Sequence, residues 1–383
     1  MTKRVGILTA GSDSPGVNAA IRGFGKAVIN NYGMELIGFR EGFEGLVEDH
    51  TMDLQAETAL SGILTRGGTI LGTSLIMPQA MPSASGALAD RSEEAIATYQ
   101  RHHLDALLVI GDRKAQAAAF ALSQMGLNIV TIPKAAENDI PETDKSIGYD
   151  SAREIATEAI DRLHTTATAT HRVMLVELIG NTAGWLTLGA GLASGADVIL
   201  IPEIPYDYDY VTGAILKRKQ AGRNFSLVVV AERARSRELA NFMAMAARKK
   251  TETAEEQEKE LEKIEGNYSA QTLLLARRLQ EATGLDTRIT ILGSLVRGGT
   301  PTAADRLLAT QLAEWSAMMV FRGEYGRMAC RRDGAMNSVS LEQVAGRSKP
   351  IPLDHGWIRG AIQVGTCLGV DAASLPGFSA PGA

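Results

Sequence analysis

Short apolar runs that alternate with helical patterns are the feature that most constrains the fold of this 383-residue chain. The runs are rich in Val, Ile and Leu and are bounded by polar or glycine-containing segments. Such runs are typical of strands that are buried on both faces of a parallel sheet. We expect strands of this kind at Val5–Leu8, Glu35–Phe39, Ala106–Ile110, Ile129–Ile132, Val173–Glu177, Val198–Ile201, Leu227–Ala231 and Arg288–Leu292.

Helical patterns separate these strands. They are clearest at Asn18–Asn30, Gln116–Met125 and Ser151–Thr166. The alternation predicts a three-layer α/β protein with mainly parallel sheets. Proteins of this class bind their ligands in the loops at the carboxyl ends of the strands, so functional residues are expected there.

Composition excludes several classes of function. The net charge is −5 and the pI is near 5.8, so we expect neither nucleic acid nor an anionic membrane as the main partner. No stretch is long and apolar enough to predict a membrane span. Cys330 and Cys367 are the two cysteines, which predicts free thiols and a cytoplasmic location.

Two segments depart from the α/β pattern. Pro78–Gly86 is rich in Pro, Ser, Ala and Met, which predicts a surface loop. The insert 248–266 carries Glu and Lys at three- and four-residue spacing, which favours a helix with few positions to bury. We expect a solvated helix there; a helix that docks a partner is the alternative.

The first loop, Thr9–Arg22, joins a predicted strand to a predicted helix. Gly11 and Gly16 allow close approach of the backbone to a ligand. The free N–H groups at a helix N-terminus attract an anion. The loop is therefore a candidate phosphate site, although many α/β turns carry glycine only to turn.

Four further motifs accompany this loop: Thr65–Thr73, Pro133–Asp139, Ile160–Thr166 and Gly293–Pro301. Because the loop and these motifs occur together, the chain resembles the phosphofructokinases, in particular the bacterial branch that includes pyrophosphate-dependent and mixed-substrate enzymes.

The resemblance implies two Rossmann-like three-layer lobes with the active-site cleft between them. Residues 1–148 plus about 293–345 would form the lobe that binds ATP or pyrophosphate with Mg²⁺. Residues 149–292 plus the C-terminal segment would form the sugar-phosphate lobe for fructose 6-phosphate. The resemblance further implies a homo-oligomer, or a hetero-oligomer with an active phosphofructokinase.

Several residues of the expected donor site depart from the family pattern. Those expected to contact the donor phosphate are Gly11, Ser12, Lys134, Arg113 and Lys114. Ser12 replaces a glycine, and an arginine that contacts the donor is replaced by Leu75.

The residues expected to form the metal site differ more strongly from the family pattern than those of the donor site. Arg113 and Lys114 stand where the family has an acidic residue that holds Mg²⁺, and Asp112 remains as the candidate metal ligand, displaced by one position. Either the metal site is lost, or the two cations replace the metal in neutralising a bound anion. We expect Mg²⁺ if the chain is active, and otherwise no cofactor.

The catalytic candidates are Glu137 and Asp139. The family places an aspartate where this chain has Glu137, which extends the carboxylate by one methylene. A misplacement of about 1 Å costs on the order of 100-fold in rate. Ala135 also removes a hydroxyl from the same motif, whereas Asp139 is retained.

The expected sugar-phosphate site keeps some of the family's residues and lacks others. The residues that align with those the family uses are Arg172, Glu232, Arg288 and Arg297. Asn181 and Ser294 replace an arginine and a histidine that contact the substrate in the family. The remaining arginines would bind a phosphorylated sugar or another small anion; alternatively, Arg288 and Arg297 build a subunit interface.

Changes therefore concentrate where the donor, the metal and the reacting hydroxyl are expected, while motifs such as Ile160–Thr166 match the family. This distribution predicts a non-catalytic or weakly active protein that serves as a regulatory or phosphosugar-binding subunit. The alternative is an active 6-phosphofructokinase that transfers phosphate from pyrophosphate, or from ATP, to O1 of fructose 6-phosphate.

Overall fold

The computed structural model describes residues 2–82, 86–248, 268–376 and 378, which fall into two compact units. Unit 1 comprises Met1–Ala152 and Arg297–Lys349, and unit 2 comprises Arg153–Val296 and Pro350–Ala383. The resemblance predicted changes of lobe near residues 148 and 293, and the two units divide after Ala152 and before Arg297. Most of the insert 248–266 lies outside the described residues.

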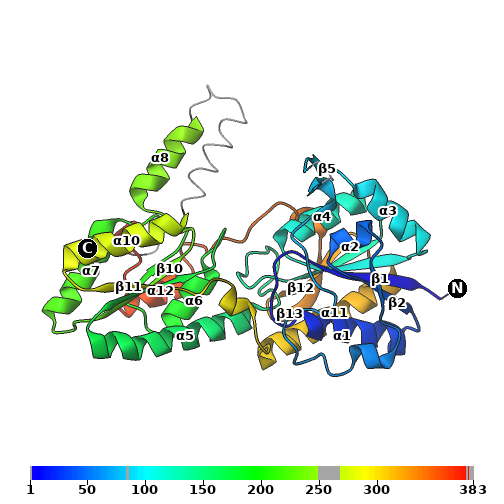
Figure 1. Cartoon of the computed structure of the whole chain (residues 1–383), viewed down its shortest axis with the longest axis horizontal. Helices are drawn as coiled ribbons and strands as arrows, with labels where there is room; N and C mark the ends of the chain where they lie inside the picture. The colour runs from blue at the N-terminus through cyan, green and yellow to red at the C-terminus, as the bar shows by residue number, and fades with distance from the viewer. Residues whose placement is uncertain (1, 83–85, 249–267, 377, 379–383) are drawn as a thin grey trace. The chain divides into compact units, whose positions relative to one another are not determined.

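The helices and strands follow the predicted alternation (Figure 1). The strands are β1 Arg4–Ala10, β2 Glu35–Phe39, β3 Thr51–Asp53, β4 Met81–Pro82, β5 Leu88–Ala89, β6 Ala106–Gly111, β7 Ile129–Pro133, β8 Val173–Leu178, β9 Val198–Leu200, β10 Ser226–Ala231, β11 Thr287–Ile291, β12 Arg327–Arg332 and β13 Ala335–Ser340. The α-helices are α1 Val17–Lys26, α2 Phe43–Val47, α3 Ser92–Arg101, α4 Arg113–Gln124, α5 Tyr149–Thr170, α6 Trp185–Ala193, α7 Tyr208–Gln220, α8 Arg237–Arg248, α10 Tyr268–Thr283, α11 Ala303–Arg322 and α12 Gly356–Gln363.

Unit 1 is built on a seven-stranded sheet in the order β13-β12-β7-β6-β1-β2-β3. The central strands β2, β1, β6, β7 and β12 are paired in parallel, and β3 and β13 close the edges antiparallel. Helices α1 and α11 cover one face, and α2, α3 and α4 cover the other (Figure 1). Ile21 and Phe24 of α1 are fully buried, and each such side chain stabilises the fold by roughly 1.5–3 kcal/mol.

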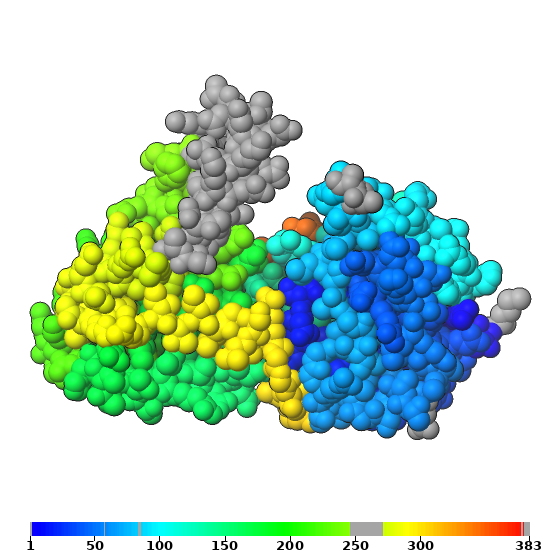
Figure 2. Space-filling view, in the orientation of Figure 1, coloured from blue at the N-terminus to red at the C-terminus, as the bar shows by residue number. Residues whose placement is uncertain are grey.

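Unit 2 is built on a parallel four-stranded sheet in the order β11-β8-β10-β9. Val211 of α7 and Leu275 of α10 pack on one face of this sheet. Gly191 of α6 approaches Ile199 and Val229, which belong to the other face. Helix α10, yellow in Figure 2, reaches the surface of this unit, where Leu273 and Leu274 are partly exposed.

The structure corrects three predictions. Arg288–Leu292 was expected to be buried on both faces, but β11 is an edge strand, so Arg288 and Ile291 are exposed. Pro78–Gly86 was expected to be a surface loop, but Pro78 and Met81 are buried and β4 pairs with β5. The helical pattern to Asn30 ends as an α-helix at Lys26 and continues as a π-helix over Ala27–Asn31.

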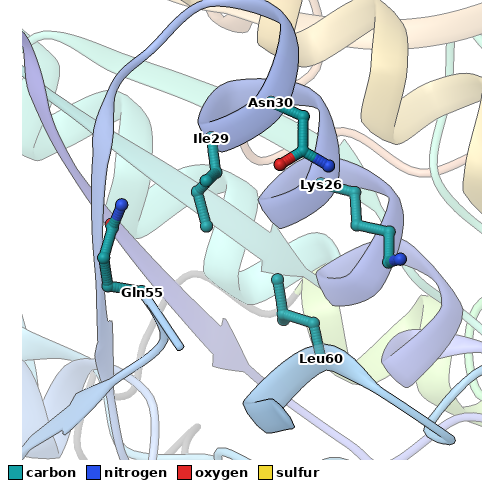
Figure 3. Close-up of a pocket in the computed structure, with 5 residues that line it drawn as sticks. All are labelled: Lys26, Ile29, Asn30, Gln55 and Leu60. Atoms are coloured by element: carbon teal, nitrogen blue, oxygen red, sulfur yellow. The ribbon is translucent and has the colours of Figure 1, made fainter. Parts of the chain in front are cut away.

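The described residues include two small hollows, one in each unit. One, of about 120 Å³, is lined by Lys26, Ile29, Asn30, Gln55 and Leu60 (Figure 3). Gln55 accepts a hydrogen bond from the backbone of Leu36 at the start of β2, so this hollow lies at the amino ends of the strands. Among the described residues, no helix is long and apolar enough to cross a bilayer.

A glycine in α2 tests the packing of unit 1. A Cβ on Gly45 would lie 1.6 Å from the backbone oxygen of Arg40, so we expect Gly45→Ala to destabilise the protein by about 1–3 kcal/mol. Gly213 of α7 is the control, because a Cβ there meets nothing within 4 Å. Gly213→Ala should stabilise by about 0.5–1 kcal/mol. Urea unfolding followed by circular dichroism measures both, and equal effects would contradict the packing described.

Candidate active site

The loops that follow β1 and β6 lie side by side, because Ala10 at the end of β1 pairs with Gly111 at the end of β6. Gly11 continues from β1 with a left-handed φ of 86°, and its N–H donates to Ser74 O at 2.8 Å. Helix α4 begins directly after Asp112. The loops therefore present a glycine turn and the N-terminus of α4 to the same point, whereas the helix N-terminus expected from the sequence was that of α1, which follows the first loop.

The side chain of Asp112 lies at this point. Its Oδ1 accepts the backbone N–H of Ala115 at 3.0 Å and so caps α4. Its Oδ2 accepts the backbone N–H of Ser12 at 2.9 Å. A Cβ on Gly11 would lie 2.1 Å from Cγ of Asp112, so the carboxylate lies directly against the bare glycine backbone.

Lys134 lies directly behind the same loop. It follows β7, is 1% exposed, and its Nζ donates to Ser12 O at 2.7 Å. Burial lowers the pKa of Lys134 to about 8, although the negative charges of Asp112 and Asp13 favour its protonated form. The site thus holds a buried amine with a pKa of about 8.

The two catalytic candidates are each paired with an arginine. Arg297 lies 3.5 Å from Oε1 of Glu137, and Arg113 lies 3.5 Å from Oδ2 of Asp139. The side chains of Glu137 and Asp139 are only 16% and 12% exposed. Arg113, expected to contact the donor phosphate, is therefore held against a catalytic candidate, while Lys114 is exposed.

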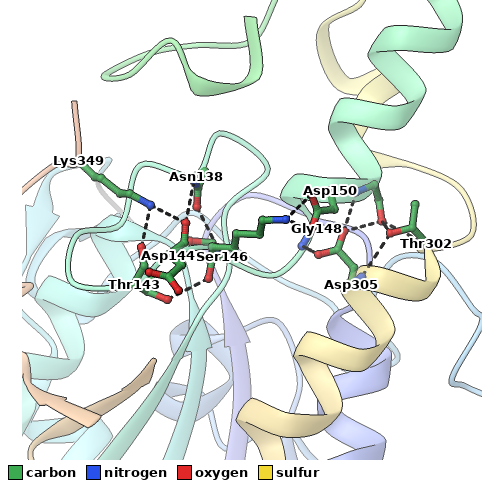
Figure 4. A network of polar contacts seen from close by, with 11 residues as sticks. Asn138, Thr143, Asp144, Ser146, Gly148, Asp150, Thr302, Asp305 and Lys349 are labelled. Atoms are coloured by element: carbon green, nitrogen blue, oxygen red, sulfur yellow. Dashed lines mark hydrogen bonds and ion pairs between the residues drawn. The ribbon is translucent and has the colours of Figure 1, made fainter. Parts of the chain in front are cut away.

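A polar network holds the loop that carries these acids (Figure 4). Asn138 adopts a left-handed φ of 53°, and its Oδ1 accepts the N–H of Ser146 at 3.0 Å. Lys349 donates through Nζ to the carbonyl oxygens of Thr143 and Asp144 at 2.7 and 2.8 Å. Burial lowers the pKa of Lys349 to about 8, while Asp144 opposes that shift.

The carboxyl end of the loop, where it enters α5, is held by Asp305 at the start of α11 (Figure 4). Its carboxylate accepts the N–H of Gly148 at 2.9 Å and both the N–H and the hydroxyl of Ser151, at 2.7 and 2.6 Å. Burial raises the pKa of Asp305, and the hydrogen bonds from Ser151 and Gly148 counteract that shift.

Sequence reasoning assigned no function to Lys349 or Asp305. For Asp305 a signal existed, because Thr302 and Asp305 have the spacing of a helix-capping motif. Lys349 had no such signal, since it lies more than 200 residues from the carbonyl oxygens that it binds.

A resident magnesium ion does not fit these side chains as they are arranged. Asp112, expected as a metal ligand, uses both oxygens to accept backbone N–H groups. No group of three or more His, Cys, Asp or Glu suited to a metal occurs in the part of the chain that the structure describes. Mg²⁺ is commonly held by one or two carboxylates plus the phosphates of a ligand, so the side chains described here would hold magnesium only together with such a ligand.

The expected sugar-phosphate residues are divided between the units. In unit 2, Arg172 and Arg288 converge on Asp286, at 2.8 and 3.0 Å. Glu232, also in unit 2, follows β10, and its N–H donates to Leu178 O. Arg297 belongs to unit 1, where it pairs with Glu137.

A second hollow, of about 300 Å³, lies in unit 2 beyond the carboxyl end of β9. Glu203 and Arg237 line it together with apolar side chains that include Leu353 and Leu375. The carboxylate of Glu203 accepts the N–H groups of Gly184 and Ile351 at 3.0 and 2.9 Å. Burial raises the pKa of Glu203.

Two named relatives are similar to this chain over nearly its whole length. One, from Propionibacterium freudenreichii, is named ATP-dependent 6-phosphofructokinase; it is 47% identical over 374 residues, which cover 96% of this chain and 100% of the relative. A protein of the same name from Spirochaeta thermophila is 46% identical over 371 residues, covering 96% and 98%.

A solved structure agrees in fold. The pyrophosphate-dependent phosphofructokinase from Marinobacter aquaeolei superposes with a TM-score of 0.73 at 19% identity, covering 99% of this chain and 94% of the other. This likeness confirms the predicted α/β architecture. The sequence profile described as phosphofructokinase matches residues 4–320. The resemblance inferred from the motifs is thereby confirmed, and the chain belongs to the phosphofructokinase family.

Proposed function

We propose that this protein is a 6-phosphofructokinase that transfers the terminal phosphoryl group of ATP to O1 of fructose 6-phosphate. The observation that carries the proposal is the 47% identity, over 96% of the chain, to a protein named ATP-dependent 6-phosphofructokinase. For the alternative of an active enzyme, we placed pyrophosphate before ATP as the donor expected from the sequence; we now propose ATP, because both relatives described above are named for ATP.

The same names favour activity over the non-catalytic function that we expected from the altered motifs. That expectation treated the altered residues one at a time. In the fold, the unexpected cation Arg113 is paired with the retained Asp139, and Glu137 is paired with Arg297. Nothing in the comparisons supports a hetero-oligomer with another phosphofructokinase.

Glu137 is the general base of the proposed reaction. The O1 oxygen of the sugar attacks the γ-phosphorus, and its proton passes to the Glu137 carboxylate. The new O1–P bond forms as the bond between the γ-phosphorus and the β–γ bridging oxygen breaks, and ADP leaves. Arg297, 3.5 Å from Glu137, orients that carboxylate.

Cations of this chain offset the charge that spreads over the transferring group. Phosphoryl transfer depends mainly on positioning and electrostatic stabilisation. Lys134 lies behind the donor loop, and Arg113 and Lys114 begin the helix beside it. In unit 2, Arg172 and Arg288, which share Asp286, are the proposed ligands of the sugar 6-phosphate.

The direct test is a coupled assay for fructose 1,6-bisphosphate, run with ATP and magnesium and separately with pyrophosphate and magnesium. We expect sustained turnover with ATP and a slower rate, or none, with pyrophosphate. If circular dichroism shows that the protein is folded and neither donor gives turnover, the proposal is wrong and the non-catalytic hypothesis is favoured.

Removal of the charge from Glu137 tests its catalytic role. We expect Glu137→Gln to lower kcat by at least about 100-fold, with the KM for ATP changed less than about threefold. Glu142→Gln is the matched control, because Glu142 lies on the same loop and pairs with Arg332 at 3.3 Å. Steady-state kinetics should show the control near wild type; equal losses in both variants would argue against Glu137 as the base.

The lowered pKa of Lys134 predicts a pH dependence. Lys134 is protonated below pH about 8 and becomes neutral above it, so its attraction for the donor is lost as the pH rises. We expect the KM for ATP to increase between pH 7 and pH 9, while the KM for fructose 6-phosphate does not follow. A KM for ATP that stays constant over this range would show that the charge of Lys134 does not contribute to donor binding.

A further inference from the structure

We propose that the Asp112 carboxylate occupies the backbone anion site of the donor loop, and that it must turn away before a donor phosphate binds there. Asp112 would thereby set the affinity for the donor. The inference rests on the proposed function, because it takes the ligand to be the terminal phosphate of a polyphosphate donor.

The hydrogen bonds of Asp112 are those of a bound anion. Its two oxygens accept N–H groups from two separate loops, Ser12 after β1 and Ala115 at the start of α4. Converging backbone N–H groups at a helix N-terminus form a ready site for an anion. A carboxylate and a phosphate each present oxygens that accept from such a pair of donors.

Capping of α4 alone does not account for this arrangement. Asp207 caps α7 and Asp371 caps a 3₁₀ helix, and in each case Oδ1 accepts an N–H two residues further along the chain. Asp112 also caps its helix through Oδ1, by accepting the N–H of Ala115, three residues further along. Its second oxygen reaches Ser12, 100 residues away, and that bond is the one that fills the anion site.

The space against Gly11 is filled by the same side chain. Gly11 has the left-handed φ of 86°, and the position of a Cβ on it lies 2.1 Å from both Cγ and Oδ2 of Asp112. A ligand cannot approach the bare backbone at Gly11 while the carboxylate remains there. Asp112 is only partly buried, so rotation of its side chain would carry it into solvent.

The charges of the site agree with this interpretation. Lys134 is buried behind the loop, and Asp112 is the nearby acid that most favours its protonated form. The positive charge that a donor phosphate would neutralise is therefore already neutralised within the chain. A donor must both replace the two hydrogen bonds and displace the negative charge.

Asp112→Ser separates the two roles of this residue. Serine caps a helix about as well as aspartate, but it is neutral and too short to reach Ser12 N. Asp207→Ser is the matched control, since it makes the same change at the cap of α7 in unit 2. A second variant, Asp112→Gly, opens the site further at a capping cost of only a few tenths of a kcal/mol.

The probe is inorganic pyrophosphate without magnesium, titrated into each full-length protein by isothermal titration calorimetry. We expect Asp112→Ser and Asp112→Gly to bind it at least about tenfold more tightly than the wild type, and Asp207→Ser to match the wild type. Thermal unfolding verifies that each variant is folded.

The inference is overturned if the folded Asp112 variants bind pyrophosphate no more tightly than the wild type, or if neither variant binds it. The coupled assay separates this result from the proposed function. If the wild-type protein turns over and Asp112→Ser has the same KM for ATP as the wild type, the inference is wrong and the proposed function stands. If the Asp112 variants bind pyrophosphate more tightly but the protein has no turnover, the inference stands and the proposed function is wrong.

Discussion

The arrangement of the two loops at the carboxyl ends of β1 and β6 depends on the hydrogen bonds by which the Asp112 carboxylate joins them. Parallel pairing of β1 with β6 brings Ala10 beside Gly111 and so fixes the distance between the loops. One carboxylate then spans that distance, from Ser12 N to Ala115 N. The glycine at position 11 follows from this contact, because any larger residue would meet the carboxylate.

Charge pairing is the second constraint. Removing one partner of a buried ion pair costs roughly 3–5 kcal/mol, because it leaves an uncompensated charge. Glu137 and Asp139 are largely buried, and each is accompanied by an arginine. Two of the substitutions that look damaging along the sequence, Arg113 and Glu137, are thus compensated charges in the fold.

The loop that carries the acids is held at two places on its carboxyl side by buried polar groups. Lys349 binds Thr143 and Asp144, and Asp305 binds Gly148 and Ser151, where the loop enters α5. Such hydrogen bonds restrict the movement of the loop that carries Glu137 and Asp139, and the proposed phosphoryl transfer requires such accurate positioning.

Much of the fold could be predicted from sequence, because strands buried on both faces, such as β6, are unbroken apolar runs. The hairpin β12–β13 was missed for two reasons: the edge strand β13 is largely polar, and the inner strand β12 has only a short apolar run followed by Arg331 and Arg332. The site was predictable only in part. The positions of Glu137 and Lys134 followed from motifs, but the second bond of Asp112 joins residues 100 positions apart, and a linear pattern does not reveal such a contact.

The central claim, that this chain transfers phosphate to a sugar, is tested most directly by ³¹P NMR of the protein with magnesium, ATP and fructose 6-phosphate. The account predicts that the γ-phosphate signal of ATP declines while a second sugar-phosphate signal and ADP appear in equal amounts. An unchanged ATP spectrum, or one in which only inorganic phosphate appears, would contradict it.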